Sequence, residues 1–141
     1  ILNARKMSKN QMEENYPMAK KILIIDDEEL ITKSLLRLLS KEGYDATIAR
    51  SGQEAIAKVK EGMFDLIISD VRMPEMDGIE TITEIRSYLK KSNKKSVPEI
   101  LITGYADINK YEAALKLKVL DYIYKPFDNN DFLQVVKKAI G

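Results

Sequence analysis

The stretch KILIIDD at residues 21–27 decides the fold, because an unbroken apolar run ends there in two adjacent aspartates. A strand that is apolar at every position is typical of a parallel sheet with both faces covered by helices. The run Leu66-Ile67-Ile68 has the same character, and Asp70 follows it after one serine. The two runs therefore predict buried strands whose ends carry carboxylates.

Five short apolar runs alternate with five amphipathic segments along the chain. This alternation predicts a doubly wound α/β fold, in which a five-stranded parallel sheet lies between two layers of helices. The strands are expected at residues 21–26, 45–49, 65–69, 99–103 and 121–124. The helices are expected at about residues 29–41, 51–62, 78–89, 107–117 and 128–140, with Ser51 and Asp107 as N-caps.

Length and composition limit the classes of protein that the chain can be. Its 141 residues correspond to one domain, and 23 basic against 22 acidic residues give no bias toward nucleic acid or a membrane surface. The chain has no cysteine, which fits a reducing compartment. It also has no histidine, so any phosphohistidine in its chemistry must belong to a partner. No apolar stretch is long enough for a membrane span, and we expect a cytoplasmic protein.

The first residues differ in character from the rest. Residues 1–19 are polar and aperiodic, and Pro17 separates them from the first apolar run. They are interpreted as a disordered arm, a native linker or residues added for expression. We therefore expect the folded domain at residues 20–141.

Polar side chains gather where the predicted strands end. Asp26, Asp27 and Asp70 follow or close two of the strands, Thr103 closes another, and Lys125 follows the last. Because right-handed crossovers place the carboxyl ends of parallel strands at one edge of the sheet, we expect these five side chains to meet there. Two carboxylates about 4 Å apart repel by about 4 kcal/mol at an effective dielectric of about 20, so something should offset the repulsion in a close trio, and a hard cation does so. Oxygen ligands favour Mg2+, for which Mn2+ can substitute.

Each of these residues also has an ordinary interpretation. Aspartates at strand ends often cap the next helix or lie in solvent, surface lysines are usually solvated, and strand threonines are usually structural. Together, however, they supply a cation site, a carboxylate nucleophile at Asp70, an ammonium at Lys125 for a phosphate, and a hydroxyl donor at Thr103. The combination predicts a domain that receives a phosphoryl group on a carboxylate.

The same residues give the sequence its resemblance to the receiver domains of two-component response regulators, over about residues 20–141. The resemblance rests on Asp26-Asp27, on Asp70 with Met73-Pro74 and Asp77-Gly78, on Thr103 followed by Gly104, and on Tyr122 ahead of Lys125-Pro126-Phe127. It implies a flavodoxin-like (βα)5 fold with strand order 2-1-3-4-5. It also implies a signalling domain that catalyses its own phosphorylation and slow autodephosphorylation, rather than an enzyme with a separate substrate.

The resemblance assigns the chemistry of the site. It implies that Asp70 accepts the phosphoryl group from the phosphohistidine of a sensor histidine kinase or phosphotransfer protein. Asp26, Asp27, Asp70 and the backbone carbonyl of Arg72 would hold Mg2+, with Asp26 acting directly or through water. Lys125 would pair with the acyl phosphate.

The resemblance also implies how the signal is passed on. Thr103 would be drawn to the phosphoryl group and Tyr122 would turn inward, which would change the surface formed by the fourth helix, fifth strand and fifth helix. Arg72 and Tyr105 stand at positions that modulate hydrolysis of the acyl phosphate in the family. We expect both side chains to shield the phosphorus from water.

Two expectations concern the backbone. The Lys125-Pro126 bond would be cis, as the family pattern implies and proline permits. Lys118 stands where the family often has a glycine that ends the fourth helix. Either Lys118 adopts a left-handed conformation or the helix ends elsewhere, and the sequence leaves both open.

Three other functions share parts of this pattern. A haloacid-dehalogenase-like phosphatase needs an acidic residue two positions after its nucleophile, where this chain has Arg72. A flavodoxin-like cofactor binder needs a phosphate loop after the first strand, where residues 26–29 are all acidic and would repel an anion. A receiver-like module that is never phosphorylated would be expected to lack one of the site residues, and none is missing.

The predicted partners are a histidine kinase or phosphotransfer protein, with a phosphorylation-dependent homodimer through the fourth and fifth helices as a further option. We expect neither direct nucleic-acid binding nor membrane association. The sequence fits both a single-domain regulator and a fragment of a longer one.

Overall fold

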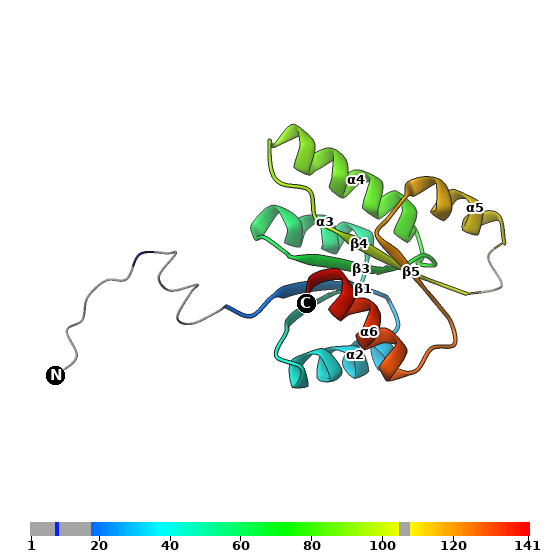
Figure 1. Ribbon diagram of the computed structural model, residues 1–141. Helices are drawn as coiled ribbons and strands as arrows, with labels where there is room; N and C mark the ends of the chain where they lie inside the picture. The colour runs from blue at the N-terminus through cyan, green and yellow to red at the C-terminus, as the bar shows by residue number, and fades with distance from the viewer. Residues whose placement is uncertain (1–7, 9–17, 105–107) are drawn as a thin grey trace.

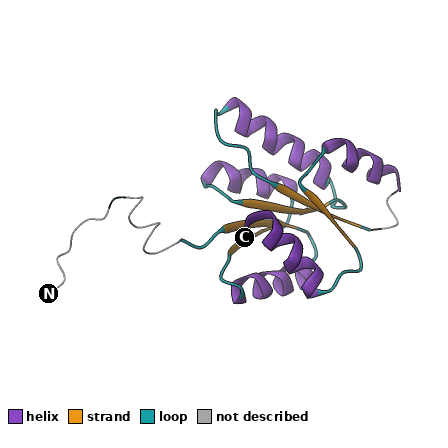
Figure 2. Cartoon of the chain, in the orientation of Figure 1, coloured by secondary structure: helices purple, strands orange, loops and turns teal. Residues whose placement is uncertain are grey.

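A computed structural model describes residue 8, residues 18–104 and residues 108–141. Five strands form one parallel sheet in the order β2-β1-β3-β4-β5, and helices cover both of its faces (Figures 1 and 2). The elements, in chain order, are β1 (Lys21–Ile25), α2 (Glu29–Lys41), β2 (Asp45–Ala49), α3 (Gly52–Glu61), β3 (Leu66–Asp70), α4 (Gly78–Lys91), β4 (Glu99–Thr103), α5 (Ile108–Leu117), β5 (Asp121–Tyr124) and α6 (Asn129–Ile140). The predicted fold class and strand order are confirmed.

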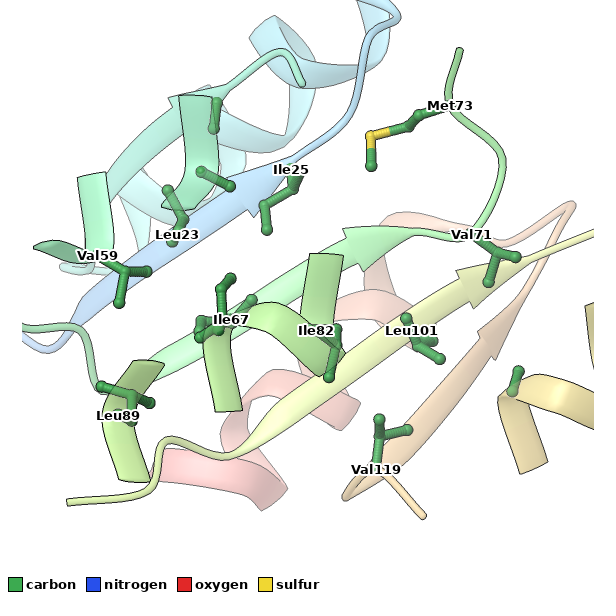
Figure 3. Close-up of a cluster of buried hydrophobic side chains, with 14 residues drawn as sticks. Leu23, Ile25, Val59, Ile67, Val71, Met73, Ile82, Leu89, Leu101 and Val119 are labelled. Carbon is green, nitrogen blue, oxygen red and sulfur yellow. The ribbon is translucent and has the colours of Figure 1, made fainter. Parts of the chain in front are cut away.

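The two faces of the sheet carry two hydrophobic cores, because successive side chains of a strand point to opposite faces. Helices α3, α4 and α5 cover one face, while α2 and α6 cover the other (Figure 1). On the first face, Ile67 of β3, Ile82 of α4 and Leu101 of β4 pack in one cluster (Figure 3). On the second face, Ile24 of β1 and Phe132 of α6 belong to the other cluster. Burying side chains of this size contributes about 1.5 to 3 kcal/mol each, which fixes the strands in their register.

Helix boundaries follow the predicted caps with small corrections. Ser51 caps α3 as predicted, since its Oγ accepts a hydrogen bond of 3.1 Å from the amide of Glu54. The last helix begins at Asn129 rather than at Asp128, because Asp128 is the N-cap and accepts from the amide of Asp131. The predicted cap Asp107 lies outside the described residues.

Two strand boundaries also differ from the prediction. The strand expected at residues 65–69 runs from Leu66 to Asp70, so Asp70 is the last residue of β3 and keeps a ladder partner, Ile102. The first strand ends at Ile25, one residue earlier than expected. Both shifts are of the size by which strand ends commonly vary.

The backbone settles the two remaining expectations. The Lys125-Pro126 peptide bond is cis, as predicted. Lys118 follows the end of α5 with φ 54, so this residue adopts the left-handed conformation that glycine adopts most easily.

Among the helices of the described ranges, none combines the length and the apolar character needed to cross a bilayer.

Candidate functional site

Three aspartates meet at the carboxyl edge of the sheet. β1 pairs with β3 so that Ile25 lies opposite Ser69, which brings the residues after them, Asp26 and Asp70, to the same level. One carboxylate oxygen from each of Asp26, Asp27 and Asp70 lies within 4.8 Å of the other two. Asp26 and Asp70 are buried, whereas Asp27 is exposed. The predicted convergence of the three carboxylates is therefore present in the structure.

Asp26 has one oxygen with a partner and one without. Its Oδ1 accepts a hydrogen bond of 3.0 Å from the amide of Glu28, whereas its Oδ2 is buried and has no hydrogen-bond partner among the described residues. Burial raises the pKa of Asp26 to about 6, and the nearby charge of Asp70 adds to this rise. Close carboxylates with an unpaired buried oxygen fit a hard divalent cation such as Mg2+, which binds through carboxylate oxygens.

Lys125 places an ammonium group beside Asp70. Its Nζ lies 3.1 Å from Asp70 Oδ2, and its own amide donates to the carbonyl of Thr103, which fixes the chain at this point. Burial raises the pKa of Asp70, although Lys125 opposes that rise. Burial alone would lower the pKa of Lys125, but attraction to Asp70 and Asp26 outweighs it and leaves that pKa raised. The ammonium is therefore charged and can bind an anion beside Asp70.

Thr103 and Tyr122 lie on adjacent strands. Thr103 closes β4 and is buried, and its Oγ1 has no hydrogen-bond partner in the described part of the chain. Tyr122 of β5 is half-buried and donates its hydroxyl proton to the carbonyl of Ala114 on α5, at 2.9 Å. The Tyr122 side chain therefore links β5 to α5.

The loop from β3 to α4 holds Asp70 in place. The amide of Gly78 donates to the carbonyl of Val71, and a Cβ at Gly78 would lie 2.1 Å from the backbone oxygen of Asp70. Only glycine therefore fits where the first turn of α4 meets the end of β3. Asp77 caps α4 by accepting from the amide of Glu80.

An ion pair that the sequence analysis missed also holds this loop. The Nζ of Lys110 on α5 lies 2.7 Å from Asp77 Oδ2. Burial alone would raise the pKa of Asp77, but its hydrogen bonds from the amide of Glu80 and from Lys110 leave that pKa lowered. No local sequence signal could have identified this pair, because the two residues lie 33 positions apart.

The two residues predicted to modulate hydrolysis are placed differently. Arg72 is exposed, and its backbone amide donates a hydrogen bond to the carboxylate of Asp70. Tyr105 lies outside the described residues. The roles of both residues stay predictions.

Known proteins resemble this chain in sequence. The family model of the response regulator receiver domain matches residues 22–137. The chain is 38% identical over 120 residues to the transcriptional regulatory protein ZraR of Escherichia coli (strain K12), and the match covers 85% of this chain and 26% of ZraR. It is also 38% identical over 120 residues to the transcriptional regulatory protein ResD of Bacillus subtilis, covering 48% of that protein. The chain thus spans about a quarter of ZraR and about half of ResD.

Solved structures show the same fold. The chemotaxis protein CheY4 of Vibrio cholerae superimposes with a TM-score of 0.76 at 30% identity, covering 86% of this chain and 99% of CheY4. A CheY-like receiver domain from Methanospirillum hungatei gives a TM-score of 0.75 at 31% identity, covering 85% of this chain and 92% of that domain. The match of the family model to most of the chain, together with these relatives, shows that the chain belongs to the response regulator receiver domain family.

Proposed function

We propose that Asp70 is the residue on which this receiver domain accepts a phosphoryl group, with Lys125 and a divalent cation neutralising the charge that the transfer brings together. Receiver domains are phosphoryl-accepting signalling switches that work with histidine kinases or phosphotransfer proteins. The observation that carries the assignment to Asp70 is its position, within 4.8 Å of the Asp26 and Asp27 carboxylates and 3.1 Å from Lys125 Nζ.

The cation would be held by the carboxylates of Asp26, Asp27 and Asp70 and by the backbone carbonyl of Arg72. When bound, Mg2+ supplies positive charge that screens the carboxylates from the incoming phosphoryl oxygens. The unpaired Oδ2 of Asp26 and the raised pKa of that group support a cation at this place. Mn2+, with similar ligand preferences, can substitute.

The transfer itself needs a nucleophile and a place for the negative charge. An oxygen of Asp70 attacks the phosphorus, the bond from phosphorus to the partner's imidazole nitrogen breaks, and that nitrogen retains the electron pair and takes a proton. Lys125 donates hydrogen bonds to a phosphoryl oxygen as the new bond forms. Asp70 is 4% exposed, so protein atoms replace most of the water around its carboxylate.

The switch would begin at Thr103. Its buried hydroxyl, which has no partner among the residues described, can donate to an oxygen of the acyl phosphate once the group is present. This movement would leave room for Tyr122, whose hydroxyl bond to Ala114 would then break. The change would alter the surface of α5, β5 and α6, which is the proposed output and the proposed site of any phosphorylation-dependent homodimer.

Arg72 and Tyr105 would set the lifetime of the signal by shielding the phosphorus from water. If so, the double substitution of Arg72→Ala and Tyr105→Ala increases the rate of dephosphorylation. An unchanged rate would exclude this role for both side chains.

Acetyl phosphate with Mg2+ tests the proposed acceptor, because it can supply a phosphoryl group without a kinase. Intact mass spectrometry of the wild type should show one added phosphoryl group, and Asp70→Asn should show none. Asp65→Asn is the matched control, since it removes the same charge at the opposite end of β3 and should leave the adduct unchanged. An adduct of equal yield in Asp70→Asn would place the acceptor elsewhere.

A further inference from the structure

A cleft opens at the end of the sheet opposite the aspartates. It lies between the carboxyl end of α4, the loop that joins α4 to β4, and the turn between α5 and β5, and its volume is about 680 Å³. Glu99, the first residue of β4, lines the cleft, whereas Thr103, the last residue of β4, lies near Asp70. In Figure 1 the loop from α4 to β4 is at the left, and the carboxyl ends of the strands point to the right. The cleft is therefore separate from the phosphorylation site.

Apolar side chains form part of the lining of the cleft. Leu89 of α4 is buried, Val97 and Pro98 of the loop are half-buried, and Leu120 is 56% exposed. A leucine that is more than half exposed at the edge of a cleft offers apolar surface to a partner. An apolar side chain of a partner could therefore bury its surface against these four residues.

The other side chains that line the cleft give it a positive charge. Four of them are basic, Arg86, Lys90, Lys94 and Lys118, while Glu99 is the one acidic side chain among the lining residues. Arg86 and Glu99 form a close ion pair, so their charges cancel. The three lysines remain, and no carboxylate of the described residues lies within ion-pair distance of them. Lys94 Nζ donates to the hydroxyl of Tyr88 at 3.2 Å and lies 5.3 Å from the centre of that ring, contacts that leave its charge without a carboxylate. We call this region, defined by Leu89, Val97, Pro98, Leu120 and the three lysines, the basic cleft.

The contacts of Arg86 hold the walls of the basic cleft in place. The guanidinium of Arg86 donates to Glu99 on β4 and also, at 2.7 Å, to the carbonyl of Leu117 at the end of α5. It thereby joins α4, β4 and α5 around the cleft. Walls held in this way lose little conformational entropy when a partner binds.

Lys118, which also lines the cleft, has φ 54. This backbone conformation costs a lysine more than a glycine, so a cation is present at a position that favours glycine.

We propose that the basic cleft is a docking site for a segment of a partner protein in which an apolar side chain is flanked by carboxylates. Charge complementarity favours this occupant, because the lining combines three lysines that lack carboxylate partners with four apolar residues. A second copy of this chain is a poorer match, since its net charge of +1 gives no overall attraction. The phosphates of a nucleic acid could pair with the lysines, but the apolar side chains of the cleft would have no partner.

A peptide titration followed by 1H–15N correlation spectra tests the proposal. The probe is an acetylated nonapeptide with one central leucine and four glutamates on each side, and its controls replace the leucine by glutamate or the glutamates by lysine. The expected result is saturable shifts in the amides of Lys90, Val97 and Leu120, with binding at least about fivefold weaker for the all-glutamate peptide and none for the basic one. Asp70→Asn should bind the probe as the wild type does, so the outcome does not depend on the proposed phosphorylation.

Substitutions complete the test. Lys90→Glu and Lys118→Gly should each weaken binding of the probe by at least about fivefold, while glycine at position 118 raises the melting temperature because it accepts the left-handed backbone. Lys116→Glu is the matched control, because this exposed lysine of α5 does not line the cleft, and it should bind nearly as the wild type does.

Four results would overturn the proposal. The first is that the all-glutamate peptide binds as tightly as the probe, and the second is that Lys116→Glu weakens binding as much as Lys90→Glu does. The third is that, without peptide, the amide shifts at the cleft depend on protein concentration. The fourth is that a short DNA duplex displaces the probe. The third would indicate a second copy of the chain as the occupant, and the fourth would indicate nucleic acid.

Discussion

At the scale of single residues, Lys125 and Asp70 form the contact on which the proposed chemistry depends. The ammonium of Lys125 lies 3.1 Å from Asp70 Oδ2. The pKa of Lys125 is raised, so the group is positively charged at neutral pH. Lys125→Ala should slow formation of the acetyl phosphate adduct by about 10- to 100-fold, because one preorganised charge is lost from the transition state. The rate for Lys125→Arg should lie between those of the wild type and Lys125→Ala, because arginine keeps the charge but changes the geometry of its hydrogen bonds. The rate is measured by intact mass against time, with thermal unfolding as a check on the fold.

Equal adduct rates in the wild type and Lys125→Ala would show that Lys125 takes no part in the transfer. If both Lys125→Ala and Lys125→Arg lowered the melting temperature strongly, the rates would be compared below the melting temperature of each.

Asp26 gives a prediction about pH in the metal-free protein. Burial raises its pKa from 3.8 to about 6, so the folded state holds this proton more tightly than the unfolded chain does. The stability linked to this proton is complete below the unfolded pKa and is lost as pH rises through about 6. In a chelator at pH above about 7, Asp26→Asn should therefore increase the free energy of unfolding by roughly 1 to 3 kcal/mol. The gain should shrink as pH falls toward about 4.

Urea denaturation at several pH values measures this difference. Subtracting the wild-type curve from that of Asp26→Asn removes the contribution of other titrating groups. A difference that stays constant from about pH 4 to about pH 7 would show that the charge on Asp26 is not destabilising. Addition of Mg2+ should stabilise the wild type more than Asp26→Asn, because the variant has lost one carboxylate ligand.

At the scale of secondary-structure elements, the join between β3 and α4 sets the position of Asp70. A Cβ at Gly78 would lie 2.1 Å from the backbone oxygen of Asp70, so Gly78→Ala must move one element away from the other. We expect a loss of about 1 to 3 kcal/mol in the free energy of unfolding, together with slower phosphorylation. Gly62→Ala is the matched control, since a Cβ there meets nothing within 4 Å. Similar stabilities for the two variants would contradict this account of the junction.

Most of the elements could be predicted because each depends on local pattern. The unbroken apolar run at residues 22–25 indicated a strand buried on both faces, and its residues are at most 1% exposed. Ser51 identified the start of α3 because capping uses residues three positions apart. The ends of β3 and the first residue of α6 were missed by one position. At such boundaries the flanking residue is half inside the element, and its hydrogen bonds decide the assignment.

At the scale of the whole molecule, topology explains why the convergence of the three aspartates could be predicted from sequence. Parallel strands joined by right-handed crossovers end at one edge, so aspartates at strand ends had to converge once the strands were recognised. The pairs Lys110–Asp77 and Arg86–Glu99 could not be predicted, because they join different elements and depend on how the side chains pack. The basic cleft was missed for the same reason.

The most direct test of the account is to locate the modified residue chemically. Borohydride reduces an acyl phosphate to an alcohol, so a phosphorylated aspartate becomes homoserine while a free carboxylate is unchanged. After treatment with acetyl phosphate and Mg2+, then borohydride and proteolysis, the account predicts homoserine at position 70 and unchanged aspartate at positions 26 and 27. Homoserine at position 26 or 27, or reduction nowhere in a protein that carries the added phosphoryl group, would contradict the assignment of Asp70 as the acceptor.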